Sequence, residues 1–281
     1  MAAARILVLR LDASDPSARL GQWLLEAGVE LDERALDAGD ELPPDLSAHD
    51  GLLVLGGAMG AWDDTTTPYL PAVRRLLRDA VSAEVPTLGV CLGHQLLAAA
   101  NGGQVRRMPD GPEVGALLVA KRSVAVSDPL FGAMPITPDV LQWHYDEVSV
   151  LPQGAVQLAS SPECEQQAFR LGRVAWGIQF HIETTPQMVT EWAAERDEAL
   201  DDYDMDAILA RALAVHDDLE EVWQPFAARF ADIVRDPSSA PSVAGPAATD
   251  PMAAARAALA GELNAARAPL PMPGMRPHDD G

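Results

Sequence analysis

Short apolar runs alternate with amphipathic segments along the first third of the chain. Residues 5–11 and 29–36 predict strands, and between them residues 20–27 carry apolar side chains at the spacing of one helix face. Residues 52–55 and 86–90 predict two further buried strands, each followed by a helical pattern. This alternation indicates an α/β fold with a mostly parallel central sheet and helices on both faces, a flavodoxin-like three-layer sandwich.

After Gly102 and Gly103 the pattern changes to successive strand-like segments separated by turn residues. Five such segments are predicted, at residues 114–126, 140–150, 155–159, 167–171 and 174–181. Because no helices separate these strands, we expect hairpins that add antiparallel strands to the parallel sheet.

Two helices are predicted to close the domain, and the second carries an apolar stripe. Phe226, Phe230 and Ile233 recur on one face of this helix. Pro225 fits the first turn of a helix better than the middle of a longer helix that reaches back to Leu219, because proline lacks the backbone N–H. We expect the stripe to pack onto the domain, with a partner-docking surface as the alternative.

Composition divides the chain into a folded part and a tail. Residues 1–200 are predicted to form the main domain, and residues 201–235 the C-terminal helices packed on it. From residue 236 to residue 281, Pro, Ala, Gly and Ser replace the large apolar residues that a core requires, so we expect a disordered acidic tail. Within it, residues 252–266 are alanine-rich and are expected to be helical only transiently.

The chain carries a formal net charge of −22, from 42 acidic and 20 basic residues. This charge repels phosphate backbones and anionic lipid surfaces, so neither nucleic acid nor a membrane is an expected partner. No apolar run approaches the roughly 20 residues that span a bilayer, and the first ten residues lack the features of a secretory signal, which predicts a cytoplasmic protein. Nothing matches a Gly-x-x-x-x-Gly-Lys phosphate loop, and no cofactor is expected.

Cys91 lies at the junction of a predicted strand and a predicted helix. Gly89 and Gly93 flank it at minus two and plus two, as in a nucleophile elbow, where a tight turn presents the reactive side chain. Free backbone N–H groups and the positive dipole end of the helix favour a thiolate there. The alternative is a buried structural cysteine. Cys164 lies between two glutamates, whose charges raise a thiol pKa, so we expect it to be unreactive.

A cysteine nucleophile needs a base, and His181 is the leading candidate among six histidines. Glu183 stands two residues further on, which puts both side chains on one face of an extended chain and lets the carboxylate orient the imidazole. His94 is an alternative base, although a structural hydrogen bond is its expected role. Zinc binding by Cys91, His181 and Glu183 is a further alternative, but the paired spacing of zinc ligands is missing and no metal is predicted.

Three segments resemble the class I (triad) glutamine amidotransferase family, in the stand-alone form similar to GMP synthetase. Leu55-Gly-Gly-Ala58 is similar to its oxyanion loop, Gly89-Val-Cys-Leu-Gly-His-Gln95 to its nucleophile elbow, and Gln179-Phe-His-Ile-Glu183 to its histidine–glutamate motif. The likeness covers residues 5–192, and residues 142–148 resemble the Trp-His-Gly-Asp stretch of the stand-alone members.

The resemblance implies roles for residues around the triad. The backbone N–H groups of Gly57 and Leu92 are expected to form the oxyanion hole, where one donor is typically worth about 10²–10³ in rate. Gln95 is expected to help hold the glutamine substrate. His144 and Tyr145 belong to the Trp-His-Gly-Asp-like stretch and are expected to border the substrate. Because Tyr145 stands where the family has glycine, we expect it to reshape the glutamine pocket.

The resemblance implies hydrolysis of the glutamine side-chain amide through a Cys91 glutamyl thioester, which gives glutamate and ammonia. No second catalytic domain is recognisable, so ammonia would pass to a separate synthetase subunit or be released. Two alternatives remain open. One is a γ-glutamyl peptidase or hydrolase that uses the same triad on γ-glutamyl amides, and the other is a catalytically silent regulatory subunit.

Overall fold

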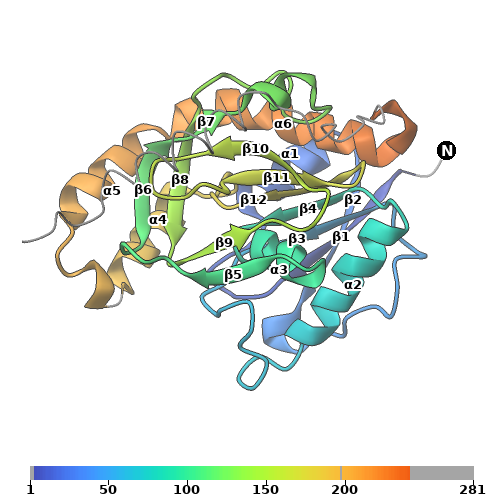
Figure 1. Cartoon of the computed structure of the whole chain (residues 1–281), viewed down its shortest axis with the longest axis horizontal. Coiled ribbons are helices and arrows are strands. Elements are labelled where there is room, and N and C mark those ends of the chain that lie inside the picture. The colour runs from blue at the N-terminus through green and yellow to red at the C-terminus, as the bar shows by residue number, and fades with distance from the viewer. Residues whose placement is uncertain (1–2, 197, 241–281) are drawn as a thin grey trace, which may run out of the picture. The chain divides into compact units, whose positions relative to one another are not determined.

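A computed structural model describes residues 3–196 and 198–240 of the 281-residue chain. Its centre is an eight-stranded sheet with the order β2-β1-β3-β4-β12-β11-β10-β7 (Figure 1). The predicted tail beyond residue 240, including the alanine-rich segment at 252–266, lies outside the described residues. Just before that limit, the 3₁₀ helix η4 (Pro237–Ser239) follows the last α-helix and Ala240 is buried, so described structure continues past the predicted tail boundary at residue 236.

Five of the eight strands run parallel and lie next to one another in the sheet. Their order is β2-β1-β3-β4-β12, so β1 lies between β2 and β3, as in flavodoxin-like folds. The bounds are Arg5–Arg10 for β1, Glu30–Ala35 for β2, Gly51–Val54 for β3, Thr87–Val90 for β4 and Ala175–Ile178 for β12. The predicted fold class, an α/β fold with a mostly parallel sheet, is confirmed.

Antiparallel strands complete the sheet and form two small sheets beside it. In the main sheet these are β7 (Ala120–Lys121), β10 (Val156–Ser160) and β11 (Ala168–Leu171). The pairs outside it are β5 (Gln104–Arg107) with β9 (Asp146–Val150), and β6 (Glu113–Leu118) with β8 (Asp139–His144). The expectation of added antiparallel strands is therefore confirmed, although β5 was not predicted.

Helices cover both faces of the sheet, because its central strands are apolar on both sides. In β1 the side chains of Ile6 and Val8 enter one buried cluster and those of Leu7 and Leu9 enter another. The first cluster includes α1 (Ala18–Glu26) and α6 (His216–Arg235), and the second includes α2 (Leu70–Ser82) and α3 (Leu92–Ala100) (Figure 1). Each cluster joins the helices of one outer layer to one face of the sheet.

The helices at the C-terminal end differ from the prediction in number and in length. Three α-helices follow β12 within the described residues, not two: α4 (Pro186–Ala194), α5 (Met205–Ala214) and α6. Pro225 lies inside α6, so the prediction that it begins a helix is wrong. Leu219 and Phe226, before and after the proline, are both buried, and this continuous packing offsets the one backbone hydrogen bond that proline removes.

The segment predicted as one strand over residues 114–126 is in fact divided. It forms β6 and β7 and then a 3₁₀ helix, η2 (Ser123–Ser127). Val124 and Val126 of η2 are exposed, so the β-branched residues that suggested a strand there face outward.

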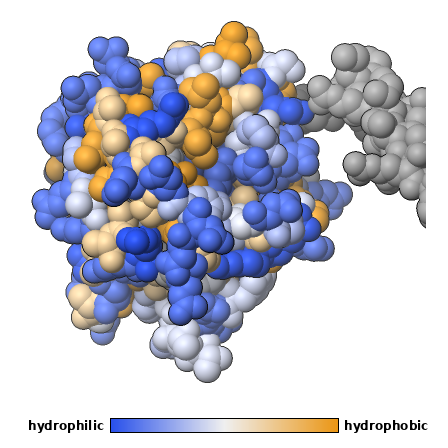
Figure 2. Space-filling view, turned by 90° about the vertical axis from the view of Figure 1, so that its left-hand side faces the viewer, coloured by the Kyte–Doolittle hydropathy of each residue, from blue (hydrophilic) through white to orange (hydrophobic). Residues whose placement is uncertain are grey.

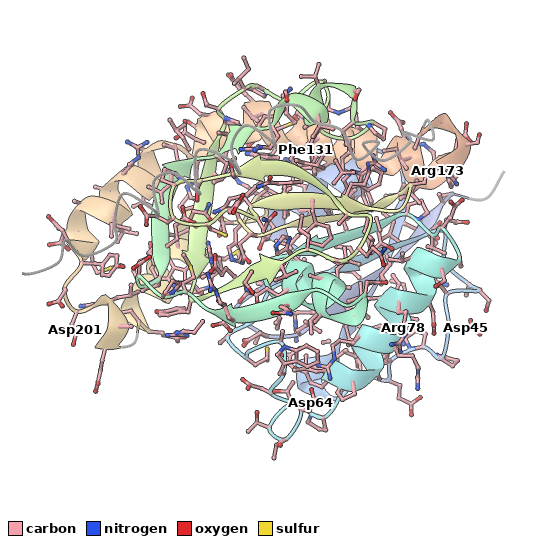
Figure 3. The ribbon with its side chains drawn as sticks, in the orientation of Figure 1. Asp45, Asp64, Arg78, Phe131, Arg173 and Asp201 are labelled. Carbon is pink, nitrogen blue, oxygen red and sulfur yellow. The ribbon has the colours of Figure 1, made fainter. Side chains whose placement is uncertain are left out.

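The surface is mixed in character. Figure 2 views the end of the molecule that carries α5, β6 and β8, where hydrophilic residues dominate and apolar residues are interspersed. In Figure 3 the labelled side chains of Asp45, Asp64 and Asp201 lie at the periphery. Among the described residues, no helix has both the length and the apolar character needed to cross a membrane.

Candidate active site

A cavity of about 480 Å³ lies where the parallel strands end. Cys91 follows β4 directly, and His181 stands three residues after β12. Because β4 and β12 are neighbours, with Val90 opposite Ile178, both residues emerge at the same edge of the sheet. Gly57 reaches this edge from β3 and Asp15 from β1. Crevices at the carboxyl ends of parallel strands are the usual ligand sites of such folds.

The elbow at Cys91 has the strained backbone that its flanking glycines predict. Cys91 adopts φ 49° and ψ −105°, a positive φ that few non-glycine residues adopt. A Cβ atom on Gly93 would lie 2.1 Å from the carbonyl oxygen of Val54, and one on Gly89 would lie 2.5 Å from the carbonyl oxygen of Gly93. Only glycine fits at either position, so the turn can press α3 against β3 and β4.

His181 and Glu183 form a buried hydrogen-bonded pair. His181 Nδ1 lies 2.6 Å from Glu183 Oε1, and the second carboxylate oxygen accepts a hydrogen bond from the backbone N–H of Ile182 at 2.9 Å. Both side chains are at most 2% exposed. The structure therefore fixes the Nδ1 side of the imidazole and leaves the Nε2 side for other partners.

The thiol of Cys91 interacts with the His181 imidazole. Burial disfavours a charged imidazole, but the negative charge of Glu183 and the charge and hydrogen bond of Cys91 together raise the pKa of His181 well above its usual value. This environment favours the charged, imidazolium form of His181. Cys91 is 6% exposed and lines the cavity.

The two residues whose backbone groups are predicted to form the oxyanion hole lie close together. Gly57 and Leu92 both line the cavity, and a Cβ atom on Gly57 would lie 3.3 Å from the Leu92 side chain. Leu92 is the first residue of α3, where helix geometry leaves the N–H without an intrahelical partner. The Gly57 loop is held by Asp12, whose carboxylate accepts a hydrogen bond from the N–H of Ala58 at 3.2 Å.

Gln95 connects the elbow with the wall of the cavity. Its side-chain amide donates to the carbonyl oxygen of Asp146 at 3.1 Å and to Gln179 Oε1 at 3.2 Å. Gln179 in turn points its amide nitrogen at Cys91 Sγ, 3.7 Å away. Gln179 was not predicted as a site residue, although the alternation that pairs His181 with Glu183 also places Gln179 on their side of the chain.

His144 and Tyr145 line the cavity on the side of β8 and β9. His144 is 2% exposed and contacts the carbonyl oxygen of Asp146 through Nδ1 at 2.9 Å and Glu113 Oε2 through Nε2 at 3.1 Å. The ring of Tyr145 carries the guanidinium of Arg107, whose central carbon is 4.5 Å from the ring centroid. The tyrosine thus brings a cation to the cavity wall.

The other reactive side chains of the sequence analysis lie outside the cavity. Burial lowers the pKa of His94 to about 3, although the backbone of Gly177 and Gln166 acts to raise it. The centroid of its ring lies 4.9 Å from that of Phe169. Burial, with a smaller contribution from the charge of Glu113, raises the pKa of Cys164 to about 12. Neither residue lines the cavity.

Asp15 is a cavity residue that the sequence analysis missed. Its carboxylate is buried, and Oδ1 lies 3.9 Å from His181 Nδ1. Burial raises the pKa of Asp15 to about 6, an effect that the charge of His181 partly offsets. Asp15, His181 and Glu183 are close enough to share a metal ion, a different set from the considered zinc ligands. Both Glu183 oxygens are already hydrogen-bonded within the chain, which fits a hydrogen-bonding role better.

The fold and the site define an α/β protein with a cysteine on a nucleophile elbow and a histidine–glutamate pair beside it. A family model, glutamine amidotransferase class-I, matches residues 18–192. The chain belongs to this family. Proteins similar to it include hydrolytic enzymes.

The proteins that are similar in sequence to this chain are named for different activities. It is 30% identical over 173 residues to the glutamine amidotransferase-like protein YfeJ of Salmonella typhimurium, covering 60% of this chain and 71% of the relative. It is 29% identical over 152 residues to gamma-glutamyl peptidase 4 of Arabidopsis thaliana, covering 53% and 60%. It is 34% identical over 117 residues to one component of the glutamine-hydrolysing GMP synthase of Methanocaldococcus jannaschii, covering 41% and 60%. The chain thus spans less than two thirds of the last two relatives.

Solved structures agree with this membership. A glutamine amidotransferase of Thermotoga maritima superposes with a TM-score of 0.73 at 28% identity, over 83% of this chain and all of the other. The fold described above is thus that of a class I glutamine amidotransferase.

Proposed function

We propose that the protein hydrolyses the side-chain amide of glutamine, with Cys91 as nucleophile, His181 as general acid and base, and Glu183 as the group that orients the imidazole. The Cys91 thiolate attacks the amide carbon, and the N–H groups of Gly57 and Leu92 stabilise the oxyanion. His181 gives a proton to the leaving nitrogen, so ammonia departs and a glutamyl thioester remains.

The second half of the proposed reaction returns the enzyme to its starting state. His181 takes a proton from water, the resulting hydroxide attacks the thioester carbon, and the carbon–sulfur bond breaks. Glutamate leaves and Cys91 is again paired with His181. Ammonia then passes to a separate synthetase subunit or is released, and the cytoplasm is the proposed compartment because its reducing conditions keep a nucleophilic thiol free.

The geometry of Cys91 carries this proposal. A structural cysteine has no need of a strained backbone with φ 49°, two neighbouring positions that only glycine can occupy, or an imidazole whose far nitrogen is held by a buried carboxylate. These features together match the roles of nucleophile, base and orienter. They also weigh against a silent regulatory subunit, for which such strain would have no use.

A γ-glutamyl peptidase or hydrolase is the second candidate. The observation that favours it is the cavity, whose volume of about 480 Å³ falls in the range of about 300–1,000 Å³ typical of pockets for ligands larger than an amino acid. Tyr145 and Arg107 extend its wall with an aromatic ring and a cation. Such a wall suits a substituent on the γ-amide nitrogen, and one relative is named gamma-glutamyl peptidase 4.

One assay tests the nucleophile and separates the candidates. The purified protein is incubated with glutamine and with γ-glutamyl amides and dipeptides, and released ammonia and amines are quantified. We expect turnover by the wild type and at least about a 10³-fold loss in Cys91→Ala, because removal of the nucleophile ends covalent catalysis.

The matched control is Cys164→Ala, which removes the other thiol at a buried position outside the cavity and is expected to keep the wild-type rate. Turnover of γ-glutamyl amides without turnover of glutamine would select the peptidase. If the wild type consumes none of these compounds, or if Cys91→Ala is as active as the wild type, the proposed function is wrong.

A further inference from the structure

Two carboxylates, not one, face the Nδ1 edge of the His181 imidazole. Glu183 makes the 2.6 Å hydrogen bond to Nδ1, and Asp15 Oδ1 lies 3.9 Å from the same nitrogen. They reach the ring from different parts of the sheet, Asp15 from the segment after β1 and Glu183 from the segment after β12. The proposed function uses Glu183 and leaves Asp15 without a role.

The approach of Asp15 to the imidazole depends on a glycine. A Cβ atom on Gly56 would lie 2.4 Å from Asp15 Oδ1 and 3.2 Å from His181 Cε1, so any larger residue would separate the two side chains. The opposite oxygen, Asp15 Oδ2, accepts a hydrogen bond from the Ser14 hydroxyl at 2.7 Å. The backbone oxygen of Ser14 accepts a hydrogen bond from the Trp192 indole at 3.0 Å, which ties this segment to α4.

From this geometry we infer that Asp15 is a positioning residue, a second carboxylate that stabilises the His181 imidazolium and so maintains the Cys91 thiolate. The inference rests on the proposed pairing of Cys91 with His181. An opposite charge within about 4–6 Å favours the charged form of a titratable group. Glu183 orients the ring through its hydrogen bond, and Asp15 adds charge from the cavity side.

The surroundings of Asp15 place the titration of its carboxyl near neutral pH. After burial, the strongest influences on the carboxyl are His181 and the Ser14 hydroxyl, which favour its ionised form, and Glu183 and Asp12, which oppose it. On the α4 side, Glu195 and Arg196 line the same cavity. With its pKa raised to about 6, Asp15 is neutral in mild acid and charged above neutrality, so its support for the imidazolium appears as pH rises through 6.

The test measures the reactivity of Cys91 without any substrate. Iodoacetamide alkylation of the full chain is followed by intact mass between pH 4.5 and pH 9, for the wild type and for Asp15→Asn, which keeps the side-chain shape. The wild type is expected to show an inflection near pH 6 before its plateau. In Asp15→Asn the inflection is expected to disappear. The alkylation rate at pH 7 is expected to fall about tenfold, which is the effect of lowering the stability of the imidazolium–thiolate pair by the equivalent of one pKa unit.

Ser14→Ala supplies the second variant, because it removes a hydrogen bond that lowers the Asp15 pKa and leaves the carboxylate in place. Its inflection is expected to move to higher pH with the plateau unchanged, which a merely structural role of this segment does not predict. If Asp15→Asn and wild type have the same profile while Cys91 reacts rapidly in both, the inference is wrong and the proposed function stands. If wild-type Cys91 reacts no faster than a free thiol at pH 7, both are wrong.

Discussion

At the scale of single residues, the candidate site depends on backbone positions that tolerate very few side chains. Cys91 holds a positive φ, a conformation that costs of the order of 1–3 kcal/mol and persists only where its surroundings enforce it. Gly89 and Gly93 help to hold this conformation, because without a Cβ atom their backbone can lie close to neighbouring backbone. The strain is thus part of how the thiol is presented to the cavity.

Replacement of Gly93 by alanine tests this account of the elbow. Its Cβ atom would lie 2.1 Å from a backbone oxygen of Val54, which cannot rotate away. We expect Gly93→Ala to lower the free energy of unfolding by at least about 3 kcal/mol, the upper part of the range for overpacked positions, and to reduce turnover strongly. Urea denaturation and the amide assay measure the two effects.

Gly154→Ala is the control for that substitution. Gly154 has φ +82°, but a Cβ atom there has no neighbour within 4 Å, so only conformational strain applies. A loss of about 1 kcal/mol and unchanged turnover are expected. If Gly93→Ala is no more destabilising than Gly154→Ala, the steric account of the elbow fails.

The residue scale also separates what the sequence could indicate from what it could not. Cys91, His181 and Glu183 were predicted because each stands in a local pattern, an elbow or an extended alternation. Asp15 belongs to no such pattern and comes to His181 only because β1 and β12 lie in one sheet. Gln179 stood within a recognised motif, but its contact with Cys91 depends on the pairing of β4 with β12.

At the scale of elements, α6 shows tertiary packing overriding a local preference. The helix runs through Pro225 for 20 residues, with Leu219 and Trp223 buried before the proline and Phe226 and Phe230 buried after it. Burial of each large apolar side chain contributes about 1.5–3 kcal/mol, so two such side chains already match the roughly 3 kcal/mol that an interior proline costs. Proline prefers the first turn of a helix when only local structure is considered. In α6 this preference is outweighed by the packing of buried side chains on both sides of Pro225.

Pro225→Ala is therefore expected to stabilise the protein. The side chain at this position is exposed, so alanine leaves the core unchanged while it restores an N–H donor and a better helix former. We expect a gain of about 1–3 kcal/mol in the free energy of unfolding, measured by urea denaturation, with unchanged turnover. Glu221→Ala, an exposed change one turn earlier in α6, is the control and should alter stability by less than about 0.5 kcal/mol. Equal or lower stability of Pro225→Ala would contradict this account.

At the scale of the whole molecule, buried titratable groups influence the free energy of unfolding and its pH dependence. The Asp15 carboxyl has its pKa raised from 3.8 to about 6 by burial, so the folded state holds its proton at pH values where the unfolded state has lost it. The free energy of unfolding therefore falls as pH rises from about 4 to about 6, as far as this group is concerned. His94 acts in the opposite direction: its pKa is lowered to about 3, so its contribution is present above pH 6.5 and is lost as pH falls toward 3.

The stability of Asp15→Asn relative to wild type should consequently depend on pH. Near pH 4 the wild-type carboxyl is protonated and the two proteins should be similar, whereas at pH 8 the variant lacks the buried charge and should be more stable by about 2–3 kcal/mol. Urea denaturation at both pH values measures this difference. Asp206→Asn, an exposed change in α5, is the control. A constant difference between Asp15→Asn and wild type across the range would contradict the raised pKa.

Local patterns in the sequence were enough to determine the fold class, the elbow at Cys91 and the candidacy of His181 with Glu183, because periodicity, glycine spacing and strand alternation act between residues close in the chain. The tertiary structure alone decided the length of α6, the contact of Gln179 with Cys91 and the placement of Asp15 against His181. These depend on which strands are neighbours and which surfaces a helix covers. Pairing and packing join segments far apart in sequence, and no local pattern records them.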